Sequence, residues 1–146
     1  MSRRAHAAFD GEGARLAGGR WNHRGTPVLY TSATLSLAAL EYFVNLDPSD
    51  APDDLVATSA DVPDGLALTA VREKGLPSGW RGYPAPEALA DLGTEWARRR
   101  STAVLAVPSA VVPPETNYLL NPAHPESRRI SVGRPEAFSL DPRMRK

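Results

Sequence analysis

The chain has 146 residues, enough for one domain with a buried core, and its 17 basic and 17 acidic residues give a formal net charge of zero. This balance argues against a protein that binds nucleic acid or an anionic membrane surface through charge. The sequence has no cysteine, which excludes disulfides and thiolate metal sites, and it shows no apolar run typical of a signal peptide or membrane span, so we expect a cytoplasmic protein.

Residues 1–24 are rich in arginine and glycine, a composition that suits a loop close to an anion, because glycine lets backbone amides approach a phosphate. The segment matches neither a GxGxxG nor a Walker fingerprint. Arg20 follows a pair of glycines and precedes Trp21, and its planar guanidinium can hold a phosphate or a carboxylate at two points. The alternative for Arg20 is a surface arginine that stacks on Trp21.

The next segment, PVLYT at residues 27–31, has the composition of a short central strand. Tyr30 lies near its end, where its ring can stack on a base or a sugar and its hydroxyl can form a hydrogen bond. An ordinary core tyrosine is the alternative at this position.

A helix is predicted over residues 33–45, with Thr31 or Ser32 as its cap and the Asp-Pro pair at 47–48 as its end. Its residues are apolar nearly all round, which predicts burial on most sides. Glu41 is the exception, and no basic residue of the same helix can neutralise it. This carboxylate either meets a cation from elsewhere, is protonated, lines a cleft or reaches solvent along an exposed stripe, and we favour the cleft.

The rest of the chain alternates strands, loops and a helix, and its 14 prolines and 11 glycines favour an irregular α+β fold with short elements. We expect a strand at 55–62, a second at 66–71 that can pair with it, a loop at 75–86 with Trp80 and Tyr83 folded against the body, and a helix at 87–99 broken or kinked at Gly93. Further along we expect a buried strand at 103–107, turns around Asn121 and His124, and a weak strand at 137–140.

Four side chains near the ends of separate elements can form a cleft: Arg20, Tyr30, Glu41 and Ser109, which follows the strand at 103–107. Taken alone, Ser109 is equally a turn former after a proline. The sequence shows no Ser-His-Asp pattern, no pair of close carboxylates and no metal spacing among its three histidines. An arginine, an aromatic ring, a hydroxyl and one carboxylate can instead hold a dinucleotide and stabilise positive charge on a ribose carbon while a leaving group such as nicotinamide departs.

Two segments of the chain stand out, GARLAGGRWNHRGTPVLYTSATLSLAALE and, far downstream, VLAVPSAVVPPETNYLLNPAHPE. Together they resemble the RES domain family, whose name stands for a signature Arg, Glu and Ser. The resemblance covers nearly the whole chain and implies a single RES domain over residues 1–146, a fold similar to ADP-ribosyltransferases, and a bacterial toxin of a type II toxin–antitoxin pair that consumes NAD. By motif position it places the signature residues at Arg20, Glu41 and Ser109, with Tyr30 as the active-site tyrosine.

Our mechanistic hypothesis gives each of these four residues a role. Arg20 would grip the NAD pyrophosphate or a nearby ribose, and Tyr30 would pack on the nicotinamide ribose. Glu41 would stabilise the oxocarbenium-like ribose, and Ser109 would help to hold the nicotinamide side. The sequence lacks the YRI-type first strand common in the family, which carries another arginine, so either the start site is assigned late or a nearby arginine, Arg3 or Arg4, substitutes.

The acceptor stays open, because water gives hydrolysis, inorganic phosphate gives phosphorolysis and a protein side chain gives ADP-ribosylation. We favour NAD breakdown, since a small domain without a substrate-docking extension suits a small acceptor. The alternatives are an ADP-ribosyltransferase that modifies a cellular protein and a non-catalytic nucleotide-binding module. No metal and no cofactor beyond NAD as substrate is expected, and the expected partner is an Xre-type antitoxin that blocks the cleft and carries the DNA-binding function.

Overall fold

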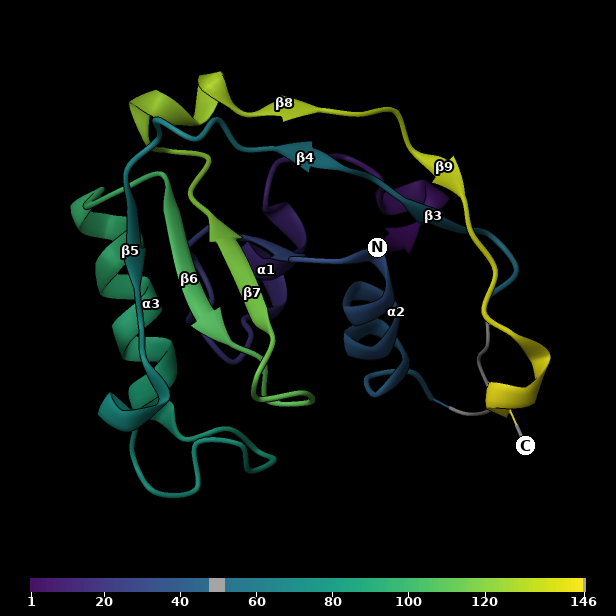
Figure 1. Cartoon of the computed structure of the whole chain (residues 1–146), viewed down its shortest axis with the longest axis horizontal. Helices are drawn as coiled ribbons and strands as arrows, with labels where there is room; N and C mark the ends of the chain where they lie inside the picture. Colours follow the sequence, from purple (N-terminus) through teal and green to yellow (C-terminus); the bar gives the residue numbers. More distant parts are fainter. Residues whose placement is uncertain (48–51, 146) are drawn as a thin grey trace.

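The computed structural model describes residues 1–47 and 52–145, and this part of the chain folds into three sheets with flanking helices (Figure 1). The α-helices of this part are α1 (Glu12–Ala17), α2 (Leu35–Phe43) and α3 (Glu87–Arg99). None of the described helices is long and apolar enough to cross a membrane. The predicted α+β class with short mixed sheets is confirmed. Pro48 of the predicted helix end lies outside the described residues.

A four-stranded sheet forms the body of the molecule, in the order β2-β7-β6-β5. Its strands are β2 (Leu29–Ser32), β5 (Leu68–Ala70), β6 (Val104–Pro108) and β7 (Thr116–Leu120). β7 runs antiparallel to both β2 and β6, whereas β5 is parallel to β6. The strands predicted at 27–31, 66–71 and 103–107 are therefore confirmed. The strand at 66–71 pairs with β6, however, and not with the segment at 55–62.

Side chains alternate between the two faces of β6 and β7, so each face of the sheet has its own apolar core. Leu105, Val107 and Leu119 point to the face that α3 covers. The other buried residues of this core are Trp21, Val28, Trp80, Leu89, Trp96 and Ala97. Val104 and Leu120 point to the opposite face, where a smaller buried cluster also contains Leu66 and Ala103. The face toward α3 thus carries the larger of the two cores.

Gly93 lies in the middle of α3, which runs without a break from Glu87 to Arg99. A Cβ atom at this position would lie 1.9 Å from the carbonyl oxygen of Trp21. The predicted break or kink at Gly93 is therefore wrong, because the glycine serves a close approach between two backbones. On the next residue, the Thr94 hydroxyl accepts a hydrogen bond of 2.9 Å from the main-chain N–H of His23. Helix α3 thereby fixes the segment that carries Arg20.

Two small antiparallel sheets lie beside the body (Figure 1). The first contains β1 (Ser2–Arg3), β3 (Leu55–Ala57) and β9 (Glu136–Ala137), and the second contains β4 (Ala60–Asp61) and β8 (Ser131–Val132). The strand predicted at 55–62 is split, because β3 and β4 join different sheets. The strand predicted at 137–140 is present as β9 but begins one residue earlier and is shorter. The N-terminal segment, which shows no YRI-type sequence, contributes β1, and β1 pairs with β3.

Helix α2 confirms the predicted helix but is shorter at both ends. Its N-cap is Thr34, whose Oγ1 accepts a hydrogen bond of 3.1 Å from the main-chain N–H of Leu37. The predicted caps, Thr31 and Ser32, are wrong, because both residues belong to β2 and their hydroxyls bond to β7. A Thr in extended conformation directly before the first turn is the ordinary N-cap geometry.

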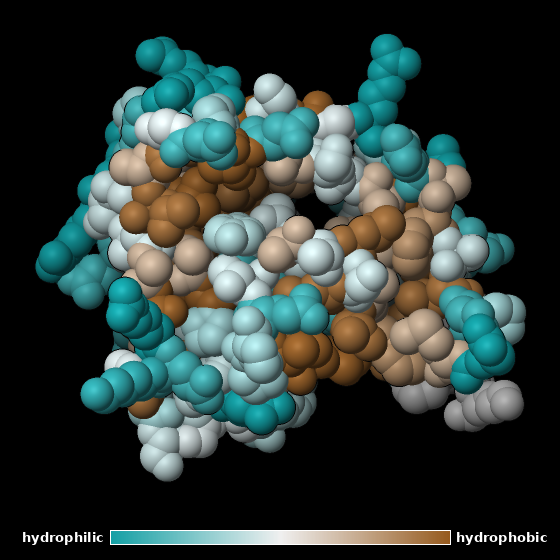
Figure 2. Space-filling model, in the orientation of Figure 1, coloured by the Kyte–Doolittle hydropathy of each residue, from teal (hydrophilic) through white to brown (hydrophobic). Residues whose placement is uncertain are grey.

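Most apolar side chains of α2 are half-buried or exposed rather than buried. Leu37 is the single buried residue of the helix, whereas Leu35 and Leu40 expose 53% and 37% of their surface. Val44, directly after the helix, exposes 54%. The predicted burial on most sides is therefore wrong. Figure 2 shows hydrophobic surface in the region of α2, to the right of the central sheet in the view of Figure 1.

Candidate active site

Glu41 lies on the second turn of α2 and points to the central sheet. Its Oε1 accepts a hydrogen bond of 2.7 Å from the Ser109 hydroxyl and a second of 2.6 Å from the Asn117 side-chain amide. The two donors come from the end of β6 and from β7. Hydrogen bonds to an ionised carboxylate are among the stronger ones in proteins. Glu41 is half-buried, and these two hydrogen bonds tie its carboxylate to the end of the sheet.

Ser109 is completely buried at the end of β6. Its hydroxyl donates to Glu41 and accepts from the main-chain N–H groups of Val111 and Val112, at 3.1 and 2.9 Å. Its own main-chain N–H donates to the carbonyl of Glu115 at 2.9 Å. A serine hydroxyl has one donor and two acceptor positions, so the hydrogen-bonding capacity of Ser109 is fully used.

Asn117 links Glu41 to a second serine. The Asn117 Oδ1 accepts a hydrogen bond of 2.7 Å from the Ser32 hydroxyl, while its Nδ2 donates to Glu41. Ser32 and Asn117 are directly opposite each other in the antiparallel pair of β2 and β7. Side chains opposite each other in such a pair lie on the same face and within contact distance. The sheet register therefore builds this part of the site.

Tyr30 lies on β2, two residues before Ser32 and on the same face of the strand. The residue exposes 41% of its surface, but its hydroxyl end is enclosed. The hydroxyl donates to the Asn22 Oδ1 at 2.7 Å and accepts from the main-chain N–H of Trp21 at 3.0 Å. Burial raises the pKa of the Tyr30 phenol well above its ordinary value. A Cβ atom at Gly19 would lie 2.6 Å from this hydroxyl, so the glycine leaves room for it.

Asn22 organises the loop around Tyr30 and is 1% exposed. Its side-chain amide donates to the carbonyls of Ala14, His23 and Thr26 at 2.9 to 3.1 Å. Asn22 is not among the site residues predicted from the sequence. Its signal in the sequence is weak, because an asparagine among arginines and glycines is also an ordinary loop residue.

Arg20 reaches the loop at 75–86. Its Nη1 donates to the carbonyl of Trp80 at 2.6 Å and its Nη2 to the carbonyl of Gly82 at 3.1 Å. Burial lowers the pKa of Arg20, and the nearby Glu41 carboxylate and Tyr30 hydroxyl act against this shift. Arg20 thus belongs to the same electrostatic environment as Glu41, although the structure records no ion pair between them among the described residues.

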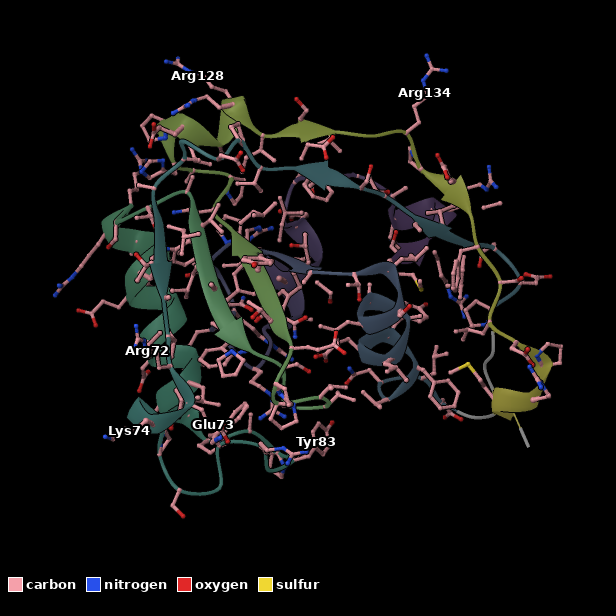
Figure 3. The ribbon with its side chains drawn as sticks, viewed as in Figure 1. Arg72, Glu73, Lys74, Tyr83, Arg128 and Arg134 are labelled. Carbon is pink, nitrogen blue, oxygen red and sulfur yellow. The ribbon has the colours of Figure 1, made fainter. Side chains whose placement is uncertain are left out.

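The loop at 75–86 has one buried and one exposed aromatic residue. Trp80 is buried in the core, as predicted, whereas Tyr83 exposes 92% of its surface, so the prediction that it folds against the body is wrong. Figure 3 shows Tyr83 on this loop at the lower edge of the molecule. The side chain of Arg81 anchors the loop again, by donating to the carbonyl of Ala110 at 3.0 Å.

The structure brings all four predicted site residues to one region, but with different partners. Glu41 and Ser109 are in direct contact, whereas Arg20 bonds to a loop and Tyr30 to Asn22. The predicted turns around Asn121 and His124 are present, and His124 caps a short 3-10 helix through its Nδ1. Ser32 and Asn117 were not predicted as site residues. Both lie within the two segments that resemble the RES family, but the sequence assigns them no role, since their pairing depends on the register of two distant strands. Among the described residues no group of three or more His, Cys, Asp or Glu could hold a metal ion.

A solved structure supports the fold. The chain is similar to a chain of the MbcT–MbcA toxin–antitoxin complex of M. tuberculosis, with a TM-score of 0.73 and 17% sequence identity, and the match covers 94% of this chain and 81% of that one. The match shows that the chain is a small α+β domain with an ADP-ribosyltransferase-like fold.

The chain belongs to the RES domain family, whose model matches residues 1–141. It is 40% identical over 138 residues to a protein of Sphingobium sp. (strain YBL2) named Prs ADP-ribosylating toxin, covering 93% of this chain and 86% of that protein. It is 36% identical over 146 residues to the protein named Toxin Res of Yersinia enterocolitica, covering 99% and 95%. A third relative, also named Toxin Res, from Photorhabdus laumondii, is 32% identical over 144 residues and covers 98% and 92%. By these matches the chain is a RES toxin.

Proposed function

We propose that this toxin cleaves the bond between nicotinamide and ribose in NAD. The observation that carries the proposal is the Glu41 carboxylate, which two donors hold by Oε1 while Oε2 receives no hydrogen bond from the described residues. When the bond breaks, its electron pair leaves with the nicotinamide nitrogen and positive charge develops on the ribose carbon and ring oxygen. A fixed carboxylate oxygen stabilises such a charge without reorganising during the reaction.

Arg20 and Tyr30 are assigned to binding. The Arg20 guanidinium suits the pyrophosphate or an adjacent ribose hydroxyl, and it would exchange its loop carbonyls for the ligand. The exposed part of the Tyr30 ring suits stacking on the nicotinamide ribose. Ser109 was expected to contact the nicotinamide side. Its fully used hydroxyl favours a different role, in which Ser109 acts on the substrate through Glu41.

NAD breakdown is the first candidate for the overall reaction. Water or inorganic phosphate would add to the ribose carbon through an oxygen atom and give up a proton, and the products would be ADP-ribose or its phosphate. Protein ADP-ribosylation is the second candidate, and the observation that favours it is the name of the Sphingobium relative, an ADP-ribosylating toxin 40% identical to this chain. Both candidates share the cleavage step that Glu41 would assist.

An antitoxin is the proposed partner of this chain. The structural neighbour was solved as a toxin–antitoxin complex, which supports a partner of this kind. We expect an Xre-type protein that covers the cleft and stops turnover. Co-elution of the two purified proteins from a sizing column checks this expectation, and separate elution would contradict it.

The decisive experiment incubates the purified chain, freed of antitoxin, with NAD in the presence and absence of inorganic phosphate. Free nicotinamide with ADP-ribose or its phosphate identifies breakdown and its acceptor, whereas label from NAD that stays on a protein identifies ADP-ribosylation. Glu41→Gln should lower turnover by about 100- to 1000-fold while NAD still binds. Glu87→Gln, an exposed glutamate at the start of α3, is the matched control and should keep full activity.

An intact NAD pool under all these conditions, with no label on protein, would overturn the proposal. NAD that binds without any turnover would then identify the chain as a nucleotide-binding module.

A further inference from the structure

The two oxygens of the Glu41 carboxylate have different surroundings. Oε1 accepts from Ser109 and Asn117, whereas Oε2 receives no hydrogen bond from the described part of the chain. An ionised carboxylate is an acceptor only, so both contacts on Oε1 require the partner to present a donor. The orientation of the Asn117 amide therefore decides whether its contact with Glu41 is attractive or repulsive.

We infer that Ser32 and Asn117 are positioning residues that hold Glu41 with Oε2 toward the substrate. This inference rests on the proposed function, because it assigns these residues to NAD cleavage through Glu41. Neither residue contacts the substrate in this assignment. Ser32 orients Asn117, and Asn117 orients the carboxylate.

The chain of hydrogen bonds has one consistent direction. The Ser32 hydroxyl donates to the Asn117 Oδ1 at 2.7 Å, which turns the Nδ2 of the same amide toward Glu41 at 2.6 Å. An amide turned by half a rotation would place its oxygen against the carboxylate. The register of β2 and β7 places Ser32 opposite Asn117. The carboxylate can only accept, and the Ser32 hydroxyl is free to donate, so the two partners together favour the orientation with Nδ2 toward Glu41 and Oδ1 toward Ser32.

The weak packing of α2 makes this anchoring important for Glu41. The helix buries only Leu37, and among the described elements its principal contact is with β2. Packing alone therefore constrains the helix less than it constrains α3. Ser109 holds Oε1 from β6 and Asn117 holds it from β7, so the two strands together fix the direction of the carboxylate. Loss of either donor would leave Glu41 free to turn about its own side-chain bonds.

The first test compares Asn117→Ala and Ser32→Ala with two matched controls. Asn45→Ala also removes an asparagine hydrogen bond to Glu41, but this bond of 2.8 Å goes to the main-chain carbonyl. Ser36→Ala changes an exposed serine of α2. Asn117→Ala should lower kcat for NAD about 10- to 100-fold, the range for a lost hydrogen bond to a charged group, with KM almost unchanged. Ser32→Ala should lower it less, and both controls should match the wild type.

A pH profile separates positioning from a merely structural role. Asn117→Asp places a second carboxyl beside Glu41, and two such groups share a proton at low pH. The protonated new carboxyl can donate to Oε1 as the amide does. Activity of Asn117→Asp should therefore rise relative to Asn117→Ala as pH falls, and this advantage should disappear at higher pH. Equal activity of the two variants at every pH would overturn the inference, as would a wild-type kcat for Asn117→Ala.

A measurement without turnover distinguishes failure of this inference from failure of the proposed function. In the NMR spectrum, the Asn117 side-chain amide signal should move when Glu41→Ala removes its acceptor, and the Asn45 signal should move far less. If the wild type cleaves no NAD, the proposed function fails. In that case a responding Asn117 signal still establishes the contact, and an unresponsive signal overturns it.

Discussion

The helices α2 and α3 use their apolar side chains in opposite ways. Helix α3 is charged on one face and buries the other, and the buried residues are Leu89, Ala90, Gly93, Thr94, Trp96 and Ala97. Helix α2 is the more apolar of the two, yet it buries Leu37 alone. Its one carboxylate is tied to the sheet by hydrogen bonds rather than by packing. The difference indicates that α3 supports the fold, whereas α2 presents the site.

This division agrees with how proteins distribute stability. Deeply packed elements carry most of the free energy of unfolding, and elements around a functional site are drawn from the less stable part of the structure. A carboxylate at the edge of such an element can meet a substrate, which a carboxylate in a packed core cannot. The comparison predicts that matched substitutions in the two helices have different effects on stability.

The largest effect is expected for Leu89→Ala. Leu89 is 0% exposed in the core between α3 and the sheet, and removing most of a buried leucine costs about 2–5 kcal/mol of unfolding free energy. The matched change on α2 is Leu40→Ala, at a side chain that is 37% exposed, and it should cost less than about 1 kcal/mol. Urea denaturation measures both losses, with the same dependence of the unfolding free energy on urea concentration (the m-value) used for the two variants. Equal losses for the two variants would contradict the conclusion that α3 contributes more to stability than α2.

Gly93→Ala should give the next largest loss. An exposed helix gains about 1 kcal/mol when alanine replaces glycine, but here the new Cβ would lie 1.9 Å from the Trp21 carbonyl oxygen. Overpacking of this kind costs about 1–3 kcal/mol, and because the clash is with backbone we expect a net loss of about 2 kcal/mol. Gly13→Ala in α1 is the control, since a Cβ there meets nothing within 4 Å. It should stabilise the chain, and a stabilised Gly93→Ala would contradict the structure.

Gly93 also illustrates what the sequence predicts and what it does not. The helix at 87–99 follows from a local pattern, but the approach of the Trp21 backbone to Gly93 is a contact between distant segments. The same reason explains α2, whose apolar sequence predicts a helix correctly and burial incorrectly. Apolar composition gives the tendency to be buried, while the number of elements available to cover a helix is set by the whole fold.

The candidate site shows the same difference between features that are local in the sequence and contacts between distant segments. Glu41 and Ser109 could be named from the sequence because each stands out locally, one as a lone carboxylate and one at the end of a strand. Their direct hydrogen bond confirms that they come together. The pairing of Ser32 with Asn117 could not be predicted, because only the register of β2 and β7 places them opposite each other. A side chain that stands out locally is thus easier to predict than a partner that only strand pairing brings to it.

A moderate effect is expected for Tyr30→Phe, on the strand that leads into α2. The change leaves the Asn22 Oδ1 and the Trp21 N–H without their partner, which costs about 1–2 kcal/mol for enclosed polar groups. Tyr83→Phe is the control, because Tyr83 is 92% exposed, and it should leave the unfolding free energy unchanged. Thermal and urea unfolding of both variants at neutral pH measure the difference.

Tyr30→Phe should also change the response to alkaline pH. Because burial raises the pKa of Tyr30, the unfolded chain loses the phenol proton first, at about pH 10. The contribution of this group to stability is fully present below that pH and is lost as pH rises above it toward the folded-state pKa. The variant should therefore lose less stability than the wild type between pH 9 and pH 11. An identical alkaline decline in the two proteins would show that Tyr30 ionises equally in both states.

The smallest effect is expected for Leu35→Gln, at the start of α2. Leucine and glutamine have similar helix propensities, and Leu35 exposes 53% of its surface, so the unfolding free energy should change by less than about 0.5 kcal/mol. Differential scanning fluorimetry against the wild type suffices as a first measurement. A loss comparable to that of Leu89→Ala would place Leu35 in a packed environment that the structure does not contain. If stability is unchanged, Leu35 is not needed to hold the fold, and the N-cap, Leu37, the half-buried side chains of the helix and the hydrogen bonds of Glu41 keep α2 beside the sheet.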